Sequence, residues 1–167
     1  FMLLLLLSQP TSLTEAELND ERVEVRHGDG RFFLKTGGRS YDLILVGIEK
    51  PSSLQTNRFY TKEFFSLAQE QLEEGGILVS QVPGSLSHTN EELRELNSSI
   101  YHSLDSVFSH IRIIPGEGRN LFLSSNSPRI SRVDPEAIVE ESRRRGISST
   151  AMVPWRVEKK LHEGWKR

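Results

Sequence analysis

Cysteine is absent from this sequence of 167 residues, and so is any excess of positive charge. Without cysteine the chain has no disulfide, no thiolate metal ligand and no cysteine nucleophile. Lysine and arginine number 21 against 23 acidic residues, and the formal net charge of −2 argues against a nucleic-acid partner. The five histidines have neither i, i+4 spacing nor companion acids, so we expect no metal site.

The sequence also lacks an apolar run of the roughly 20 residues that a membrane span needs. Residues 1–7 are apolar, but Ser8-Gln9-Pro10 ends the run, and no basic residue precedes it as in a secretory signal. The run predicts a strand of a parallel sheet, which is apolar on both faces. The alternative is the tail of a longer hydrophobic segment outside this chain. We therefore expect a cytoplasmic location, with the soluble domain of a membrane-linked protein as the alternative.

The remaining pattern alternates strands and helices. Apolar runs predict strands at 23–26, 42–47, 77–81, 111–114 and 121–124, and helical periodicity predicts helices at 31–35, 61–72, 89–107 and 134–145. Thr61 is the expected N-cap of the second helix, and Thr89 with Glu92 forms an expected capping box for the third. This order indicates an α/β fold with parallel strands, the run 42–47 at the centre of the sheet, and a terminal antiparallel hairpin.

Composition divides the chain into three parts. Residues 1–21 are an apolar strand and a polar linker, 22–128 form the α/β domain, and 129–167 form a charged helical extension. The end of the extension carries Trp155 and Trp165, which we expect to dock on a partner or on the domain itself.

Ligands of open α/β sheets bind at the carboxyl ends of the strands. Three such ends are readable, at 27–30, 47–51 and 80–83. Asp29 lies between two glycines, where its carboxylate suits the amino group of an adenine. A structural reading is also open, because an aspartate in a turn often bonds its own backbone.

Five segments in order carry a family resemblance. They are 22–31, 41–46, 59–65 (Phe-Tyr-Thr-Lys-Glu-Phe-Phe), 72–81 and the hairpin 114–125. On these motifs residues 20–128 resemble the spermidine synthase family of polyamine aminopropyltransferases. The resemblance implies the mostly parallel Rossmann-like sheet of class I S-adenosylmethionine-dependent methyltransferases. This sheet would be incomplete at its N-terminus, because no Gly-x-Gly-x-Gly loop precedes Arg22.

The resemblance also implies a ligand and its contacts. The family transfers an aminopropyl group from decarboxylated S-adenosylmethionine to an amine, so we expect a ligand of the S-adenosylmethionine type. The matching positions place Asp29 and Gly30 at the adenine, and Tyr60 and Gln81 along the active cleft. A core role for Tyr60 is the alternative.

Residues 47–51 depart from the family pattern Asp-x-x-Asp-Pro, whose first aspartate is the proposed base. Here Gly47 and Lys50 replace the two acids, and Glu49 is the remaining candidate for the catalytic residue, from a shifted position. We therefore expect an adenosyl-binding domain that is degenerate for aminopropyl transfer. The alternatives are an active aminopropyltransferase of polyamine biosynthesis whose Gly-rich half lies outside this chain, or a class I methyltransferase-like enzyme. Exposed sheet edges would favour pairing with a second copy, a partner chain or a membrane-bound segment.

Overall fold

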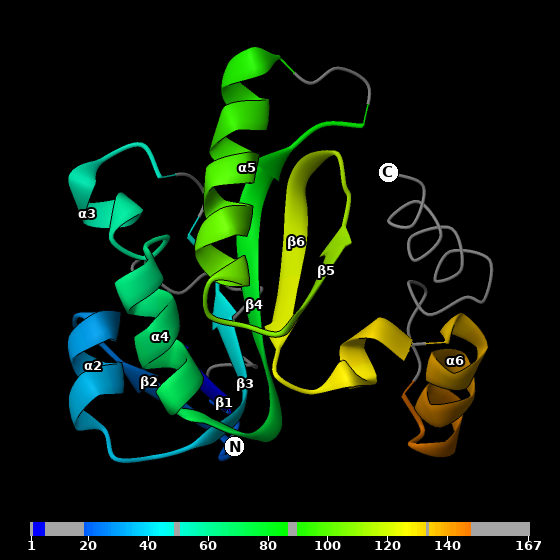
Figure 1. Cartoon of the computed structure of the whole chain (residues 1–167). Coiled ribbons are helices and arrows are strands. Elements are labelled where there is room, and N and C mark those ends of the chain that lie inside the picture. The colour runs from blue at the N-terminus through cyan, green and yellow to red at the C-terminus, as the bar shows by residue number, and fades with distance from the viewer. Residues whose placement is uncertain (1, 6–18, 49–50, 87–89, 133, 148–167) are drawn as a thin grey trace. The chain divides into compact units, whose positions relative to one another are not determined.

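The computed structural model describes residues 2–5, 19–48, 51–86, 90–132 and 134–147 (Figure 1). The chain divides into two compact units, Phe1–Arg39 and Ser40–Arg167. The boundary between these units lies inside residues 22–128, which the sequence predicts to form one α/β domain. The predicted division into residues 1–21, 22–128 and 129–167 stays a prediction. Both tryptophans lie outside the described residues.

The first unit contains a parallel strand pair and a helix. Strand β1 (Met2–Leu5) pairs with β2 (Val23–Arg26), with Met2 opposite Val23. The strand expected in the first apolar run is confirmed over Met2–Leu5. Helix α2 (Gly30–Thr36) follows β2 and buries Leu34.

The second unit is built on a four-stranded sheet in the order β3-β4-β6-β5. Its elements are β3 (Tyr41–Val46), α3 (Leu54–Asn57), α4 (Lys62–Glu70), β4 (Leu72–Gly84), α5 (Glu91–Asp105), β5 (His110–Ile114), β6 (Gly118–Ser125), the 3-10 helix η1 (Pro128–Arg132) and α6 (Pro135–Arg144). Strands β3 and β4 are parallel, whereas β4–β6 and β5–β6 are antiparallel. The α/β class and the terminal hairpin are confirmed.

Helices α4 and α5 cover one face of this sheet (Figure 1). The side chains of β4 alternate along the strand, so that Leu78, Ser80 and Val82 are fully buried and the intervening Val79 and Gln81 are half-buried. The other buried apolar residues include Phe64, Phe65 and Ala68 of α4, Ile100 and Leu104 of α5, and Phe122 of β6. This core holds the carboxyl end of β4 against the two helices.

Three elements differ from the expectations. Strand β3 lies at the edge of its sheet and not at the centre, and its Leu43 and Leu45 are each 56% exposed. An apolar run shows that both faces of a strand can be buried, but it does not show whether a strand lies on each side of it or whether helices cover its faces. Strand β4 continues through Gly75 and Pro83, and Asn90 rather than Thr89 caps α5.

The cap of α5 shows why the Thr89 prediction was wrong. The side-chain oxygen of Asn90 accepts a hydrogen bond from the backbone N–H of Leu93 at 2.9 Å. Asparagine is at least as good an N-cap as threonine, and here it is one residue closer to the helix. Thr89 itself lies outside the described residues.

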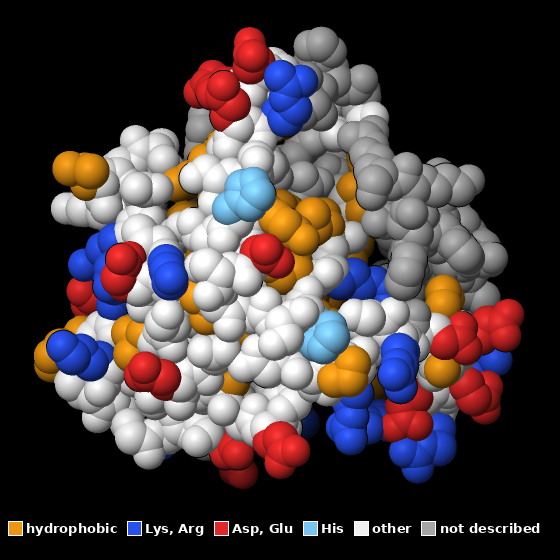
Figure 2. Space-filling view, in the orientation of Figure 1, with side chains coloured by type: hydrophobic (Ala, Val, Ile, Leu, Met, Phe, Trp, Pro, Cys, Tyr) orange, Lys and Arg blue, Asp and Glu red, His pale blue; other side chains and the backbone are white. Residues whose placement is uncertain are grey.

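Across the described residues, every helix is too short or too polar to span a bilayer. On the face drawn in Figure 2, acidic and basic side chains of the described residues are interspersed.

Candidate functional site

Three strands of the second unit meet at the carboxyl edge of β3. Val46, the last residue of β3, pairs with Ser80, so Gly47 and Gln81 both lie just beyond the paired residues. Strand β6 enters the sheet at the same edge, where Arg119 pairs with Pro83. The register therefore brings the predicted residues Gly47 and Gln81 to one edge, and it adds Arg119, which no sequence motif indicated.

Tyr60 closes this edge from the segment before α4. Its side chain is 4% exposed, and its hydroxyl lies 2.7 Å from the carbonyl oxygen of Ile48 and 2.8 Å from that of Gln81. A phenol has one proton, so it donates to one of these carbonyls at a time. Burial raises the pKa of Tyr60 to about 12. Tyr60 thus acts as a neutral donor that joins the end of β3 to β4.

Gln81 and Arg119 form the next contact along the edge. Nη1 of Arg119 donates to Oε1 of Gln81 at 3.0 Å. Gln81 is half-buried and Arg119 is exposed. Residues paired directly across antiparallel strands point to the same face, as do residues two apart on one strand, so this diagonal contact follows from the β4–β6 register. The guanidinium therefore lies at the carboxyl edge, held by the Gln81 amide.

Two asparagines brace the hairpin that carries Arg119. Nδ2 of Asn120 donates to Oδ1 of Asn97 at 3.1 Å, and Nδ2 of Asn97 donates to the carbonyl of Pro83 at 3.0 Å. Oδ1 of Asn120 accepts from the N–H of Gly116 at 3.3 Å. A Cβ on Gly84 would lie only 2.4 Å from Oδ1 of Asn120, so glycine is needed there. No local pattern pointed to these asparagines, because their pairing joins α5 to β6.

Gly47 is exposed at the end of β3, and a Cβ built on it would have no heavy atom within 4 Å. A Cβ at position 47 would therefore lie in open space. Glu49 and Lys50, the other two candidates of this segment, lie outside the described residues.

Asp29 belongs to the first unit and caps α2. Its Oδ1 accepts from the backbone N–H of Arg31 at 3.0 Å, and its side chain is exposed. Gly30 is the first residue of the helix. The cap is the local role that an aspartate in such a turn is expected to have. One carboxylate oxygen is committed to that cap, and the adenine contact of Asp29 and Gly30 stays a prediction.

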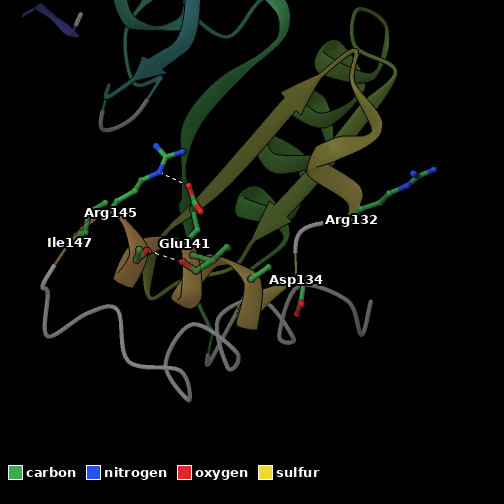
Figure 3. A pocket seen from close by; sticks show the side chains of 8 residues that line it. Arg132, Asp134, Glu141, Arg145 and Ile147 are labelled. Atoms are coloured by element: carbon green, nitrogen blue, oxygen red, sulfur yellow. Dashed lines mark hydrogen bonds and ion pairs between the residues drawn. The ribbon is translucent and has the colours of Figure 1, made fainter.

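A hollow on α6 is lined by eight residues (Figure 3). They are Arg132, Asp134, Ala137, Ile138, Glu141, Ser142, Arg145 and Ile147. Glu141 accepts from Arg145 at 2.6 Å and from Arg144 at 2.7 Å, and these hydrogen bonds lower the pKa of Glu141 to about 2. Because these charges already satisfy one another, we assign no ligand to this hollow. In the described part of the chain, His, Asp and Glu side chains form no group of three or more that would suit a metal ion.

Comparison with known proteins identifies the family. The Spermine/spermidine synthase domain matches residues 10–133, which is most of the chain. The chain belongs to this family. It is 41% identical over 69 residues to the polyamine aminopropyltransferase of Oceanobacillus iheyensis, across 41% of the chain and 14% of that protein. It is 39% identical over 128 residues to polyamine aminopropyltransferase 1 of Bacillus cereus, across 74% of the chain and 44% of that protein. The chain thus spans less than half the length of either relative.

Solved structures support the fold of this family member. A spermidine synthase in complex with the transition-state analogue AdoDATO matches 89% of the chain and 50% of its own, with a TM-score of 0.69 and 16% identity. The spermidine synthase of Thermotoga maritima matches 90% of the chain and 54% of its own, with a TM-score of 0.58 and 17% identity. The match to human methyltransferase-like protein 13 in complex with SAH covers 86% of the chain and 61% of that protein's chain, with a TM-score of 0.54 and 18% identity. The Rossmann-like, methyltransferase-type fold expected for this member is therefore confirmed.

Proposed function

We propose that this chain binds a ligand of the S-adenosylmethionine type and does not transfer aminopropyl groups with its present residues. The single observation that carries this proposal is the glycine at the end of β3. Gly47 lies at the carboxyl edge beside Gln81, at the position where the family resemblance implies the catalytic acid. The fold shared with the spermidine synthases supports the ligand class.

Aminopropyl transfer needs a base at this edge. The attacking amine forms a C–N bond to the carbon next to the sulfonium, the C–S bond breaks, and methylthioadenosine leaves. The amine must first give up a proton, which a carboxylate near the amine would take. Gly47 has no side chain to do so, and the Tyr60 hydroxyl, with its raised pKa and its carbonyl contacts, is a poor substitute.

An active aminopropyltransferase is the second candidate. The 39% identity over 128 residues to the Bacillus cereus aminopropyltransferase favours this candidate. In that case a carboxylate outside the described residues, such as that of Glu49, would serve as the base. The two candidates make opposite predictions for turnover.

The turnover test uses the unmodified chain and three variants. With putrescine and decarboxylated S-adenosylmethionine, we expect no spermidine from the wild type. The variant Gly47→Asp, alone and with Lys50→Asp, should gain measurable turnover because the open space around residue 47 admits the carboxylate. Gly47→Asn is the matched control, since it adds the same volume without the charge. Spermidine formation by the wild type at the rate of the double variant would overturn the proposal and support the second candidate.

The ligand test uses calorimetric titration with S-adenosylmethionine and methylthioadenosine. We expect Asp29→Ser to weaken both about tenfold, because serine keeps the helix cap but removes the carboxylate from the adenine. Asp134→Ser is the control, because Asp134 caps α6 through a similar bond to the N–H of Glu136 at 3.2 Å. Equal weakening by both variants, or none by either, would show that Asp29 has only its structural role.

A further inference from the structure

The contact between Arg119 and Gln81 determines how the Gln81 amide is oriented. Arginine has donors but no acceptor, so the oxygen of the amide must face Arg119 and the Nε2 group must face away. Among the described residues, Nε2 of Gln81 has no acceptor, and the remaining N–H groups of Arg119 have none either. The pair therefore presents several unsatisfied donors and one positive charge at the carboxyl edge.

Among the residues that the structure describes, no carboxylate forms an ion pair with this guanidinium. Gly47 has no side chain, and the Tyr60 hydroxyl lies against two backbone carbonyls. The carboxylate of Glu117, in the same hairpin, accepts from the backbone N–H of Leu86 at 3.0 Å. An edge of this kind repels an ammonium group and attracts an oxyanion, which can accept two parallel N–H bonds from a guanidinium.

We propose that Arg119 and Gln81 receive a carboxylate of the substrate, so that the site selects a carboxylate-bearing ligand over its decarboxylated counterpart. This inference rests on the proposed function, because it describes the same edge of the sheet. The carboxylate comes either from the adenosyl ligand or from the acceptor amine. Both sources offer the same chemistry to the pair, and two matched pairs of compounds distinguish them.

The experiment measures affinity by calorimetry on the whole 167-residue chain. The first pair is S-adenosylmethionine and decarboxylated S-adenosylmethionine, and the second is ornithine and putrescine in the presence of methylthioadenosine. The members of each pair differ only in the carboxylate. We expect the carboxylate-bearing member of one pair to bind about tenfold or more tightly than its partner, as charge-assisted hydrogen bonds imply.

Two variants and a control test the residues. Arg119→Gln should abolish the preference, because it weakens binding of the carboxylate-bearing member about tenfold more than binding of its decarboxylated counterpart. Gln81→Glu should also abolish the preference, because it places a negative charge beside Arg119 and removes the free amide donor. Arg143→Gln, on α6 and paired with Glu140 at 3.6 Å, should leave the preference intact.

The outcomes distinguish a failure of this inference from a failure of the proposed function. Adenosyl binding without a carboxylate preference, or with a preference that Arg119→Gln leaves intact, overturns this inference and leaves the proposed function standing. Binding of none of the compounds overturns both.

Discussion

At the scale of single residues, Tyr60 shows how burial turns a reactive group into a structural one. Its hydroxyl contacts the carbonyl of Ile48, which follows β3, and the carbonyl of Gln81, which lies in β4. A buried phenol keeps its proton because the phenolate would lose its hydration. The same contacts that exclude Tyr60 as a base hold the candidate site together.

The raised pKa of Tyr60 gives a pH dependence with a definite sign. The unfolded chain releases this proton near pH 10, whereas the folded chain holds it to about pH 12. Between these values the folded state binds more protons, so its stability falls as the pH rises. For a two-unit shift in pKa, the free energy of unfolding falls by about 1.4 kcal/mol by pH 11. Below about pH 9 this fall has not begun.

The variant Tyr60→Phe isolates this effect. At pH 8 it should lose about 1 kcal/mol with the hydrogen bond. Between pH 8 and pH 11 its free energy of unfolding in urea should fall less steeply than that of the wild type, by about 1.4 kcal/mol. Tyr101→Phe is the control, because its hydroxyl makes no such pair of contacts among the described residues. Parallel pH curves for wild type and Tyr60→Phe would contradict the assignment.

At the scale of elements, the sequence predicted those helices that carry their own start signal. Thr61 accepts from the N–H of Phe64 at 3.4 Å as expected, and Asp134 caps α6. Helix α3 escaped prediction because it has four residues, too few for any apolar period. Its capping box uses Ser53 and Thr56, with bonds of 3.1 and 3.2 Å between them, in place of the usual Glu at the third position.

Strand β4 and the site residues on it depend on distant partners. Pro83 and Gly84 look like a turn in the sequence, but they pair with Arg119 and Gly118 of β6. A proline is tolerated there because β3 pairs with β4 only up to Ser80, so at Pro83 strand β4 has a paired neighbour on one side only. The family motifs pointed to Gln81 and Tyr60. Arg119 lies 38 residues after Gln81 in the sequence, and only the register between β4 and β6 brings the two together. Local patterns contain no signal for such a contact.

At the scale of the whole molecule, the chain combines two compact units and a family match that crosses both. The match covers residues 10–133, whereas the units divide between Arg39 and Ser40. The family match therefore indicates common descent of residues 10–133. The two compact units describe which residues pack mainly against one another. Segments that pack as separate units open with separate free energies, which amide hydrogen exchange can measure one amide at a time.

The variant Phe65→Ala tests whether the units open independently. Phe65 is fully buried in the second unit, with its ring 6.0 Å from that of Phe64, so its truncation should destabilise that unit by about 3–5 kcal/mol. Exchange at the amides of β4 and β6 should accelerate accordingly, while the amides of β2 keep their wild-type rates. Phe32→Ala is the matched control, because Phe32 is 67% exposed and its loss should change stability by less than about 0.5 kcal/mol. Equal acceleration in β2 and β4 on truncation of Phe65 would mean that the two units unfold as one cooperative body.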